Sequence, residues 1–384
     1  MAALELLSGD ALTFLAKIWA SHVHLHHADP ADLAGLLSLD DVDHLLTSVA
    51  LRVPALRLAK DGSVLPTSTF TRTATMAGSP LTGLVDARKV LAHFDSGATV
   101  VLQGLQRYWP PLTALVRDLE LELGHPCQAN AYLTPPGSQG FARHTDSHDV
   151  FVFQTHGRKQ WEIMDCAEGA DAAEGGEERE VLLEPGLCMY LPTGTPHSAR
   201  SRDETSLHVT LGINRLTRRD LLRELAEQVL TDERYDAALP AGYLDDPDRL
   251  AAELAVSLDD LVAGLGALDA PAVADERATH FLSDRAPVLR GGLTDRVALP
   301  ALGDDTLLER RPTAACVLRP GAERLVVLLG DRSLRMPLRL AGAMAFVGDR
   351  ALFRVADLAP WLDAESRLVL TRRLVREGLL RIQA

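Results

Sequence analysis

Five short apolar runs between Cys127 and Ile213 constrain the fold more than any other feature. Turns rich in Pro, Gly and Thr (PPGS, THGR, EPG and PTGTP) separate the runs NAYLT, DVFVFQ, KQWEIM, LCMYLP and SLHVTLGI. Apolar residues that alternate over four to eight positions are typical of strands, and many short strands with regular turns form a sandwich or a small barrel. The region is therefore expected to consist of strands, with the acidic segment AEGADAAEGGEERE (167–180) as an exposed loop.

The sequence outside this region favours helices and more than one domain. The run PPLTALVRDLELELG begins at two prolines and ends at Gly124, and residues 217 to about 275 repeat apolar residues at spacings of three and four. The final hundred residues close with two helical runs and a strand, with Gly378 as a C-cap, which suggests a winged-helix-like module. At 384 residues the chain exceeds the size of one ordinary core, so we expect an α+β protein of two or three domains.

The charge of the chain is unevenly distributed. Residues 291 to 384 hold 15 Arg and 11 acidic residues, a net charge of +4, so residues 1 to 290 carry −18 within the total of −14. An acidic front part disfavours nucleic acid and favours a basic partner, although such acidity also serves solubility alone. The arginines of the last helical run, at positions 367, 372, 373 and 376, would suit DNA, but their acidic neighbours favour protein contacts.

Composition also bears on the compartment and on the cysteines. We expect a cytoplasmic protein, because the sequence has neither a secretory hydrophobic region nor an apolar run of membrane-spanning length. The four cysteines form no CxxC pair, which argues against a zinc ribbon or a disulfide framework and favours buried thiols.

Two histidines and an aspartate form a candidate metal site. His144 and Asp146 are two residues apart, so on a regular strand they would point to the same face. His197 follows a strand and a Pro/Gly turn 53 residues after His144. Two histidines and one carboxylate that leave coordination positions open are the ligands expected in non-haem Fe(II) oxygenases.

Lys159 is the candidate anchor for a co-substrate at the open positions. It follows the THGR turn, and we expect its strand to pair with the strand that follows the HxD step. Trp161 and Ile163 share its strand face, so the lysine is expected to be buried. A buried ammonium group requires an anion, which a carboxylate bound to the metal would supply.

The remaining histidines have weaker claims to a function. His148 and Asp149 are not expected to be ligands, although His148 could either rim a substrate pocket or be an ordinary polar residue of the barrel mouth. We expect His156 to lie in solvent and His208 to be either a hydrogen-bonded interior residue or a support for a ligand. The run HVHLHH (22–27) lacks an accompanying carboxylate or cysteine, which favours an extended segment beside the barrel over a metal site.

The run NAYLTPPGSQGFARHTDSHDVFVFQTHGRKQWEI resembles the ribosomal oxygenases, JmjC-type protein hydroxylases of the cupin superfamily that depend on iron and 2-oxoglutarate. The resemblance is close across residues 127–213, and the order of the parts fits the remainder. It implies a double-stranded β-helix (cupin/JmjC barrel) within a catalytic domain, 1–215, a helical dimerisation region, 216–278, and a winged-helix-like domain, 279–384.

The resemblance also implies roles for individual residues. His144, Asp146 and His197 match the iron ligands, and Lys159 matches the Lys or Arg that pairs with the distal carboxylate of 2-oxoglutarate.

Further positions match the 2-oxoglutarate pocket of the family. Asn130 and Tyr132 match residues that line it. Relatives can place a serine near the co-substrate where this chain has Gly212, and Thr210 on the same strand face could replace that hydroxyl.

These features predict an Fe(II)- and 2-oxoglutarate-dependent dioxygenase that uses O2 to hydroxylate a protein side chain. Family precedent and the acidic front part favour an Arg or His of a ribosomal protein as the target, and the family also implies a homodimer. Hydroxylation of another peptide or of a small metabolite stays open, and lysine demethylation is disfavoured by the resemblance alone. A non-catalytic cupin/winged-helix regulator is the other alternative, against which Lys159 argues because a site for metal alone needs no buried cation.

Overall fold

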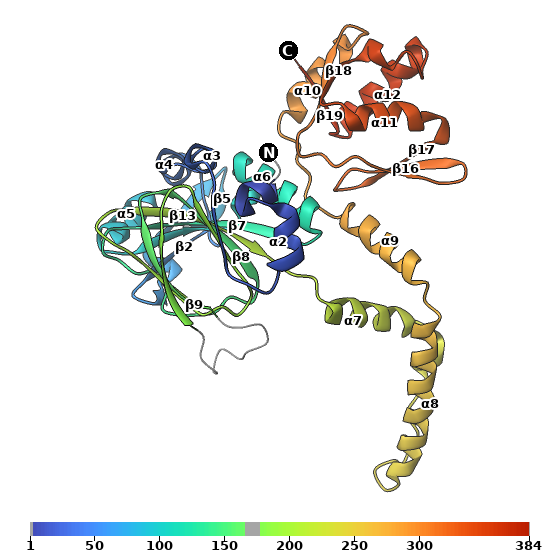
Figure 1. Ribbon diagram of the computed structural model, residues 1–384, viewed down its shortest axis with the longest axis horizontal. Helices are drawn as coiled ribbons and strands as arrows, with labels where there is room; N and C mark the ends of the chain where they lie inside the picture. The colour runs from blue at the N-terminus through green and yellow to red at the C-terminus, as the bar shows by residue number, and fades with distance from the viewer. Residues whose placement is uncertain (1–2, 166–176, 384) are drawn as a thin grey trace. The chain divides into compact units, whose positions relative to one another are not determined.

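The computed structural model describes residues 3–165 and 177–383, and the chain divides into two compact units, Met1–Arg215 and Leu216–Ala384. Figure 1 gives the order of the elements along the chain. In the part of the chain that the structure describes, no helix is both long and apolar enough to cross a membrane.

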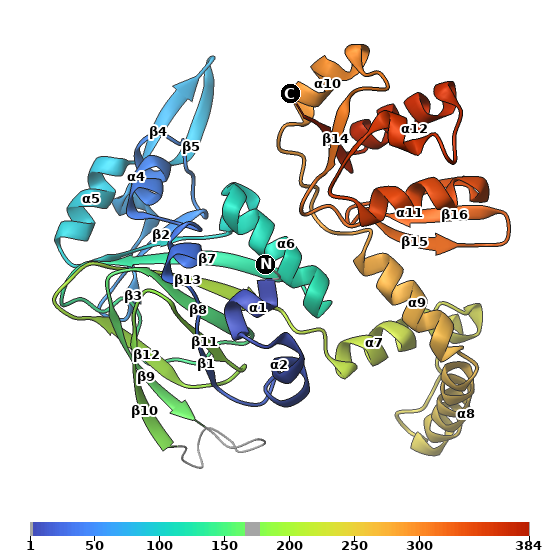
Figure 2. The same ribbon diagram turned by 45° about the horizontal axis from the view of Figure 1, so that its top comes forward.

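The first unit is built on two antiparallel sheets. The larger sheet has the order β1-β11-β8-β13-β7-β6-β2-β3. Its strands are β1 His24–His27, β2 Leu56–Lys60, β3 Ser63–Val64, β6 Thr99–Leu102, β7 Cys127–Thr134, β8 Asp149–His156, β11 Leu187–Leu191 and β13 Ser206–Ile213. The smaller sheet has the order β10-β9-β12, with β9 Lys159–Asp165, β10 Glu177–Leu183 and β12 His197–Ser201 (Figure 2).

The described part of the first unit also contains a hairpin and α-helices. The hairpin consists of β4 Thr71–Met76 and β5 Ser79–Val85. The helices are α1 Ala3–Ser8, α2 Ala11–Lys17, α3 Pro30–Ala34, α4 Leu39–Thr47, α5 Ala87–Asp95 and α6 Pro110–Leu123.

The strand prediction for residues 127–213 is confirmed, with one correction. Each of the five apolar runs forms a strand, but the expected loop 167–180 overlaps β10, which begins at Glu177. Charged side chains on the exposed part of this strand hid the alternation that Val181 and Leu183 show, since both of these are buried. The rest of that segment, 167–176, lies outside the described residues.

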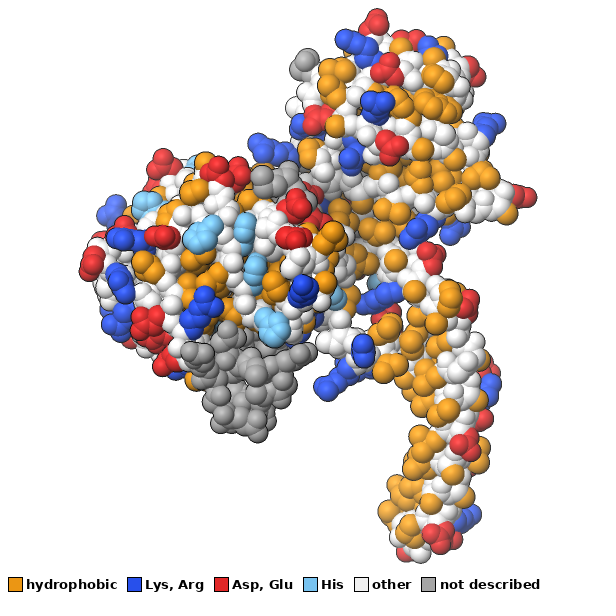
Figure 3. Space-filling view, viewed as in Figure 1, with side chains coloured by type: hydrophobic (Ala, Val, Ile, Leu, Met, Phe, Trp, Pro, Cys, Tyr) orange, Lys and Arg blue, Asp and Glu red, His pale blue; other side chains and the backbone are white. Residues whose placement is uncertain are grey.

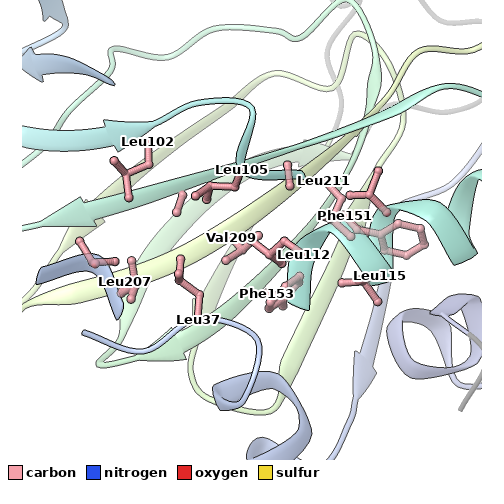
Figure 4. Packing of buried hydrophobic residues seen from close by; sticks show 14 of the residues in the cluster. Leu37, Leu102, Leu105, Leu112, Leu115, Phe151, Phe153, Leu207, Val209 and Leu211 are labelled. Carbon is pink, nitrogen blue, oxygen red and sulfur yellow. The ribbon is translucent and has the colours of Figure 1, made fainter. Parts of the chain in front are cut away.

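One face of the larger sheet packs against α6 and the N-terminal helices. Odd-numbered residues of β13, among them Val209 and Leu211, belong to one buried cluster with Leu112 and Leu115 of α6 (Figure 4). Burying each such side chain contributes about 2 kcal/mol. The prolines at the start of α6 and the left-handed Gly124 at its end are the boundaries that the sequence predicts.

The opposite face of the larger sheet looks toward the smaller sheet. Val150 and Val152 of β8 pack there with Trp161 and Ile163 of β9 in a second buried cluster. Period-two alternation therefore sends the odd residues of β13 into the main core and leaves its even residues on the face that the second sheet covers.

Two expectations about strand context are wrong. His144 and Asp146 precede β8, and His144 forms an isolated bridge with His197 instead of belonging to a long strand. Lys159 lies on β9, which pairs with β10 and β12 and not with β8. The reason is the turn at Gly157, which has φ +61° and takes the chain from the larger sheet to the smaller one instead of closing a hairpin.

The second unit begins with three helices and then forms its own core. The helices α7 Arg218–Val229, α8 Pro247–Gly266 and α9 Ala270–Phe281 agree with the predicted helical region. The C-terminal part contains α10 Gly292–Ala298, α11 Ala341–Asp349 and α12 Ala364–Arg376 around a separate hydrophobic cluster. Its two three-stranded sheets, β18-β14-β19 and β15-β16-β17, consist of β14 Leu307–Arg310, β15 Val317–Pro320, β16 Arg324–Leu328, β17 Ser333–Pro337, β18 Leu352–Arg354 and β19 Leu380–Ile382.

Helix α8 exposes an apolar surface. Leu254, Val256, Leu258 and Val262 are each more than half exposed, and Figure 3 shows hydrophobic side chains along this helix. A dimerisation role for residues 216–278 and a winged-helix role for residues 279–384 stay predictions.

Candidate functional site

The three predicted metal ligands lie together. Nε2 of His144 is 3.8 Å from Oδ1 of Asp146, and Nε2 of His197 is 3.7 Å from Oδ2 of the same carboxylate. One ligand atom from each residue can be chosen so that all three lie within 4.8 Å of one another, and among the described residues no other such group of three occurs. Reciprocal backbone hydrogen bonds of 3.0 and 2.9 Å between His144 and His197 bring the two histidines side by side.

Backbone carbonyls fix both imidazole rings. Nδ1 of His144 is 2.9 Å from the carbonyl oxygen of Ala142, and Nδ1 of His197 is 2.9 Å from that of Thr195. A carbonyl oxygen can only accept, so each Nδ1 carries the hydrogen and each Nε2 presents its lone pair toward Asp146. Two such nitrogens and one carboxylate fit a non-haem Fe(II) ion that keeps open positions.

The triad spans the boundary between the interior and the surface. The side chain of His197 is 7% exposed and that of His144 is 43% exposed. Burial is the main cause that lowers the pKa of His197, and the neighbouring His144 lowers it further. A ring that stays neutral keeps its lone pair available to a metal, while the exposed side of the triad leaves room for a substrate.

Asp149 supports the turn that carries His197. Its carboxylate is fully buried and accepts hydrogen bonds from Tyr190 Oη at 2.5 Å and from the backbone N and Oγ1 of Thr193 at 2.8 and 2.6 Å. Arg215 forms an ion pair with it at 3.1 Å. The expectation that Asp149 is not a ligand therefore agrees with its position, because its oxygens bind these other groups.

Lys159 lies in a cavity of about 280 Å³ that also contains the triad. The lysine is 4% exposed, its Nζ donates to Oγ1 of Thr134 at 2.9 Å, and burial lowers the pKa of its ammonium group to about 7. An anion beside Nζ would restore the charged form, since an opposite charge stabilises a buried ammonium. Lys159 thus places a positively charged group in the same cavity as the three candidate metal ligands.

Tyr132, Trp161 and His208 form a cluster of rings that lines the same cavity. Tyr132 stacks on His208, with ring centroids 4.8 Å apart and an interplanar angle of 2°, and Trp161 contacts His208 edge to face. Burial, followed by the nearby charge of Lys159, lowers the pKa of His208 well below its ordinary value. Its Nδ1 is buried without a hydrogen-bond partner among the described residues, so His208 faces the cavity and is not the satisfied interior residue that one expectation described.

The two residues of the NxY motif differ in which spaces they reach. Tyr132 lines both the inner cavity and an adjoining groove of about 560 Å³, whereas Asn130 lines the groove alone and accepts a hydrogen bond from the backbone N of Gly104 at 3.0 Å. Contacts of either residue with 2-oxoglutarate stay predictions, and the position of Asn130 favours contact with whatever occupies the outer groove.

The outer groove also accounts for His148 and Gly212. His148 lines the groove, and a Cβ at Gly212 would meet its Nε2 at 2.6 Å. Gly212 therefore leaves room for this imidazole, while Thr210 lines both the cavity and the groove. His148 thus lies at a groove beside the cavity, and its role at the rim of a substrate pocket stays a prediction.

The outlying histidines do not join the site. His156 is exposed at the end of β8. Residues 24–27 of the HVHLHH run form β1 at the edge of the larger sheet, and Nε2 of His24 lies 3.0 Å from the carbonyl oxygen of Ser8. The extended segment that the sequence predicts beside the barrel is confirmed.

Sequence reasoning missed several residues of the cavity. Arg57 of β2, Thr99 of β6 and Thr134 of β7 all line it or contact Lys159. They lie up to 102 residues before Lys159 in the sequence. Only the signal of a polar residue between two buried ones, as for Arg57 between Leu56 and Leu58, could have found them.

Comparisons with known proteins agree with this geometry. Residues 111–221 match the family model of the JmjC domain. Ribosomal oxygenase 1 of Rattus norvegicus is 33% identical over 234 residues, which cover 53% of this chain and 38% of the relative. The bifunctional lysine-specific demethylase and histidyl-hydroxylase NO66 of Branchiostoma floridae is 31% identical over 273 residues, which cover 64% of this chain and 43% of the relative.

A solved structure matches over a longer span. The ribosomal oxygenase YcfD of Escherichia coli, in complex with cobalt and 2-oxoglutarate, has a TM-score of 0.54 and 19% identity, and the match covers 97% of this chain and 98% of that one. This likeness shows the α+β JmjC/cupin-like fold that the resemblance implied.

Residues 111–221 of the chain thus contain a JmjC domain, and the chain is related to the ribosomal oxygenases. It spans less than half the length of the two curated relatives named above.

Proposed function

We propose that this chain is an Fe(II)- and 2-oxoglutarate-dependent hydroxylase of a protein side chain, an Arg or a His of a ribosomal protein. The observation that carries the proposal is the shared cavity, which places buried Lys159 and the His144, Asp146 and His197 triad around one chamber. A site for metal alone has no use for a buried cation, whereas 2-oxoglutarate offers a second carboxylate for it.

The iron ion, when bound, supplies the oxidation of an unactivated C–H bond by O2, coupled to the conversion of 2-oxoglutarate to succinate and CO2. The residues of the chain bind and orient the reactants. Lys159 and the Thr134 hydroxyl would hold the distal carboxylate, and the apolar walls formed by Val150, Val152 and Trp161 exclude water from the chamber. The exposed side of the triad admits the substrate.

The substrate class rests on the relatives and on charge. Two of the relatives are named ribosomal oxygenases, and another is named a histidyl-hydroxylase and lysine-specific demethylase. The net charge of −18 over residues 1 to 290 favours a basic protein at the surface of the enzyme. We further propose that residues 1–215 form the catalytic domain, that 216–278 mediate a homodimer and that 279–384 form a winged-helix-like domain for protein contacts.

An anaerobic titration of the Fe(II)-loaded protein with 2-oxoglutarate tests the proposal. We expect a visible metal-to-ligand charge-transfer band that saturates in the unmodified chain, is absent in His144→Ala and needs much more 2-oxoglutarate in Lys159→Ala. His156→Ala is the matched control, because this exposed histidine lies outside the cavity.

The opposite result is equally informative. A folded, iron-loaded protein without the band would refute the oxygenase proposal and favour the regulator. In that case, tight DNA binding with a steep salt dependence would be the next observation to seek.

A further inference from the structure

The inner cavity and the outer groove meet at a short boundary. Four residues line both spaces: Arg57, Tyr132, Asp146 and Thr210. A target side chain that reaches the triad from the groove must pass this boundary, so its charge decides which side chains can enter.

Arg57 supplies the positive charge at the boundary. It lies on β2 between Leu56 and Leu58, which are 1% and 0% exposed in the main core, so the alternation of the strand directs Arg57 to the cavity face. Its guanidinium carbon lies 5.0 Å from the centre of the Phe141 ring. Its Nε is buried without a hydrogen-bond partner among the described residues.

The groove adds charge of the same sign. Arg52 and Arg107 line the groove together with Arg57, and the other polar groups there are Gln, Asn, Tyr, Thr and His side chains. Among the described residues that line the cavity or the groove, Asp146 is the single carboxylate, and the metal requires it. The boundary is therefore positive within a unit whose sequence is strongly acidic.

This charge pattern discriminates between target side chains. A guanidinium or a methylated ammonium group at the boundary would lie beside Arg57 with no free protein carboxylate to neutralise it, and under the proposed function the carboxylates of 2-oxoglutarate would be engaged by the metal and Lys159. An unpaired buried cation next to a like charge is strongly disfavoured. A neutral imidazole carries no such cost, and the polar groups of Tyr132, Asn130 and Thr210 offer it hydrogen-bond partners.

We propose that Arg57 is a specificity-determining residue that admits an uncharged target side chain, the neutral imidazole of histidine, and excludes arginine and methylated lysine. The inference rests on the proposed function and narrows it. The acidic outer surface can still attract a basic protein, because that attraction acts at long range while Arg57 acts on the one side chain that enters.

Four pools of synthetic peptides test the inference. The pools have randomised flanks and a central His, Arg, trimethylated Lys or Gln. Mass spectrometry measures the oxidised product with Fe(II), 2-oxoglutarate and O2 present, and fluorescence anisotropy measures binding of labelled pools without O2. We expect product from the His pool to exceed product from the Arg pool on the order of 100-fold.

Charge variants at position 57 separate selectivity from folding. Arg57→Gln is expected to reduce the preference for His over Arg at least about tenfold, Arg57→Glu to reduce it further, and Arg57→Lys to retain it because the charge remains. Arg88→Gln is the matched control, since Arg88 is exposed on α5, lines neither the cavity nor the groove, and is expected to leave the preference unchanged. The charge-transfer band with 2-oxoglutarate monitors an intact site in every variant.

The outcomes are distinguishable. An Arg or trimethyl-Lys pool that reacts as well as the His pool in the unmodified chain overturns the inference, and so does a preference that survives Arg57→Glu. Absence of product from every pool, with the band present, also overturns it, because a neutral peptide side chain is expected to enter. Absence of the band itself contradicts the proposed function instead.

Discussion

At the scale of single residues, the charge of Lys159 makes co-substrate binding depend on pH. Burial lowers the pKa of this lysine from 10.5 to about 7 in the free protein, so the ammonium form that attracts an anion predominates below pH 7 and is lost above it. We expect the dissociation constant of 2-oxoglutarate to rise by about tenfold per pH unit above pH 7 until other groups intervene. Titrations of the charge-transfer band from pH 6.5 to 9 measure this slope.

Lys159→Arg serves as the control for that slope. Arginine stays protonated throughout the range, so the variant is expected to bind 2-oxoglutarate with little dependence on pH. A steep slope in Lys159→Arg would assign the titration to another group. The stability of the free protein is expected to change with pH in the opposite direction to 2-oxoglutarate binding. The pKa of Lys159 is lower in the folded than in the unfolded chain, so unfolding takes up a proton between pH 7 and 10.5. The free energy of unfolding therefore rises over this pH range.

Asp149 offers a second prediction for a single residue. Asp149→Asn removes the buried charge that Arg215 pairs with and weakens the hydrogen bonds that hold Thr193. We expect the free energy of unfolding, measured with urea, to fall by about 3 kcal/mol, because a broken buried pair leaves one group unsatisfied. Metal affinity is expected to fall as well, since the turn held by Asp149 leads to His197.

An exposed ion pair provides the comparison for Asp149. Arg158→Gln breaks the pair between Arg158 and Glu204, whose side chains are 56% and 43% exposed, and is expected to leave the free energy of unfolding nearly unchanged. Equal losses in the two variants would contradict the supporting role of Asp149.

At the scale of elements, the turn between β8 and β9 decides where Lys159 lies. A Cβ at Gly157 would meet the carbonyl oxygen of Thr205 at 2.0 Å, in addition to the strain of φ +61°. We expect Gly157→Ala to lower the free energy of unfolding by more than about 3 kcal/mol and to weaken 2-oxoglutarate binding, because the backbone must move to relieve the contact.

Gly137→Ala isolates the contact from the strain. Gly137 has φ +68°, close to that of Gly157, but nothing lies within 4 Å of an added Cβ. Its substitution is therefore expected to cost only about 1 kcal/mol in urea denaturation. Similar losses in the free energy of unfolding for Gly157→Ala and Gly137→Ala would mean that the contact with the Thr205 carbonyl does not add to the cost of the substitution.

The sequence predicts elements better than it predicts how they pair. Short apolar runs bounded by turns located β7, β8, β9, β11 and β13 correctly, although β8, β11 and β13 are buried on both faces and do not alternate in burial. The same signal could not show that the Gly157 turn leads to the other sheet, nor that His144 sits in a bridge with His197, because pairing is a property of distant segments.

In the candidate site, too, the sequence identified residues that belong to a motif but not the neighbours that distant strands contribute. The ligand types and their order along the chain pointed to His144, Asp146 and His197, which the structure does bring together. Arg57 and Thr134 reach the cavity from β2 and β7, and no spacing relates them to the triad. The residues that surround Lys159 could therefore be identified only from the three-dimensional structure.

At the scale of the whole molecule, the exposed face of α8 bears on the proposed homodimer. Leu254, Leu258 and Val262 repeat every four residues, so they lie along one side of the helix, and all three are more than half exposed. We expect Leu258→Glu with Val262→Glu to convert a dimer into a monomer in light scattering. The 2-oxoglutarate band is expected to persist, because the cavity lies within the first unit.

Met76→Glu is the matched control for the helix variant. Met76 is 65% exposed on β4 of the first unit, so the substitution removes an exposed apolar side chain at a position outside α8. The homodimer proposal fails if the unmodified chain is monomeric, and the role of α8 fails if both variants change the mass alike.

The carbonyls behind the two histidines have a consequence for how such a centre persists over evolutionary time. Positions 142 and 195 hold the rings through backbone oxygens, which every amino acid supplies. A substitution at either position keeps the hydrogen bond from the imidazole to the backbone carbonyl, and only a change in the course of the main chain would remove this bond. The orientation of the two histidine rings therefore does not depend on which side chains occupy positions 142 and 195.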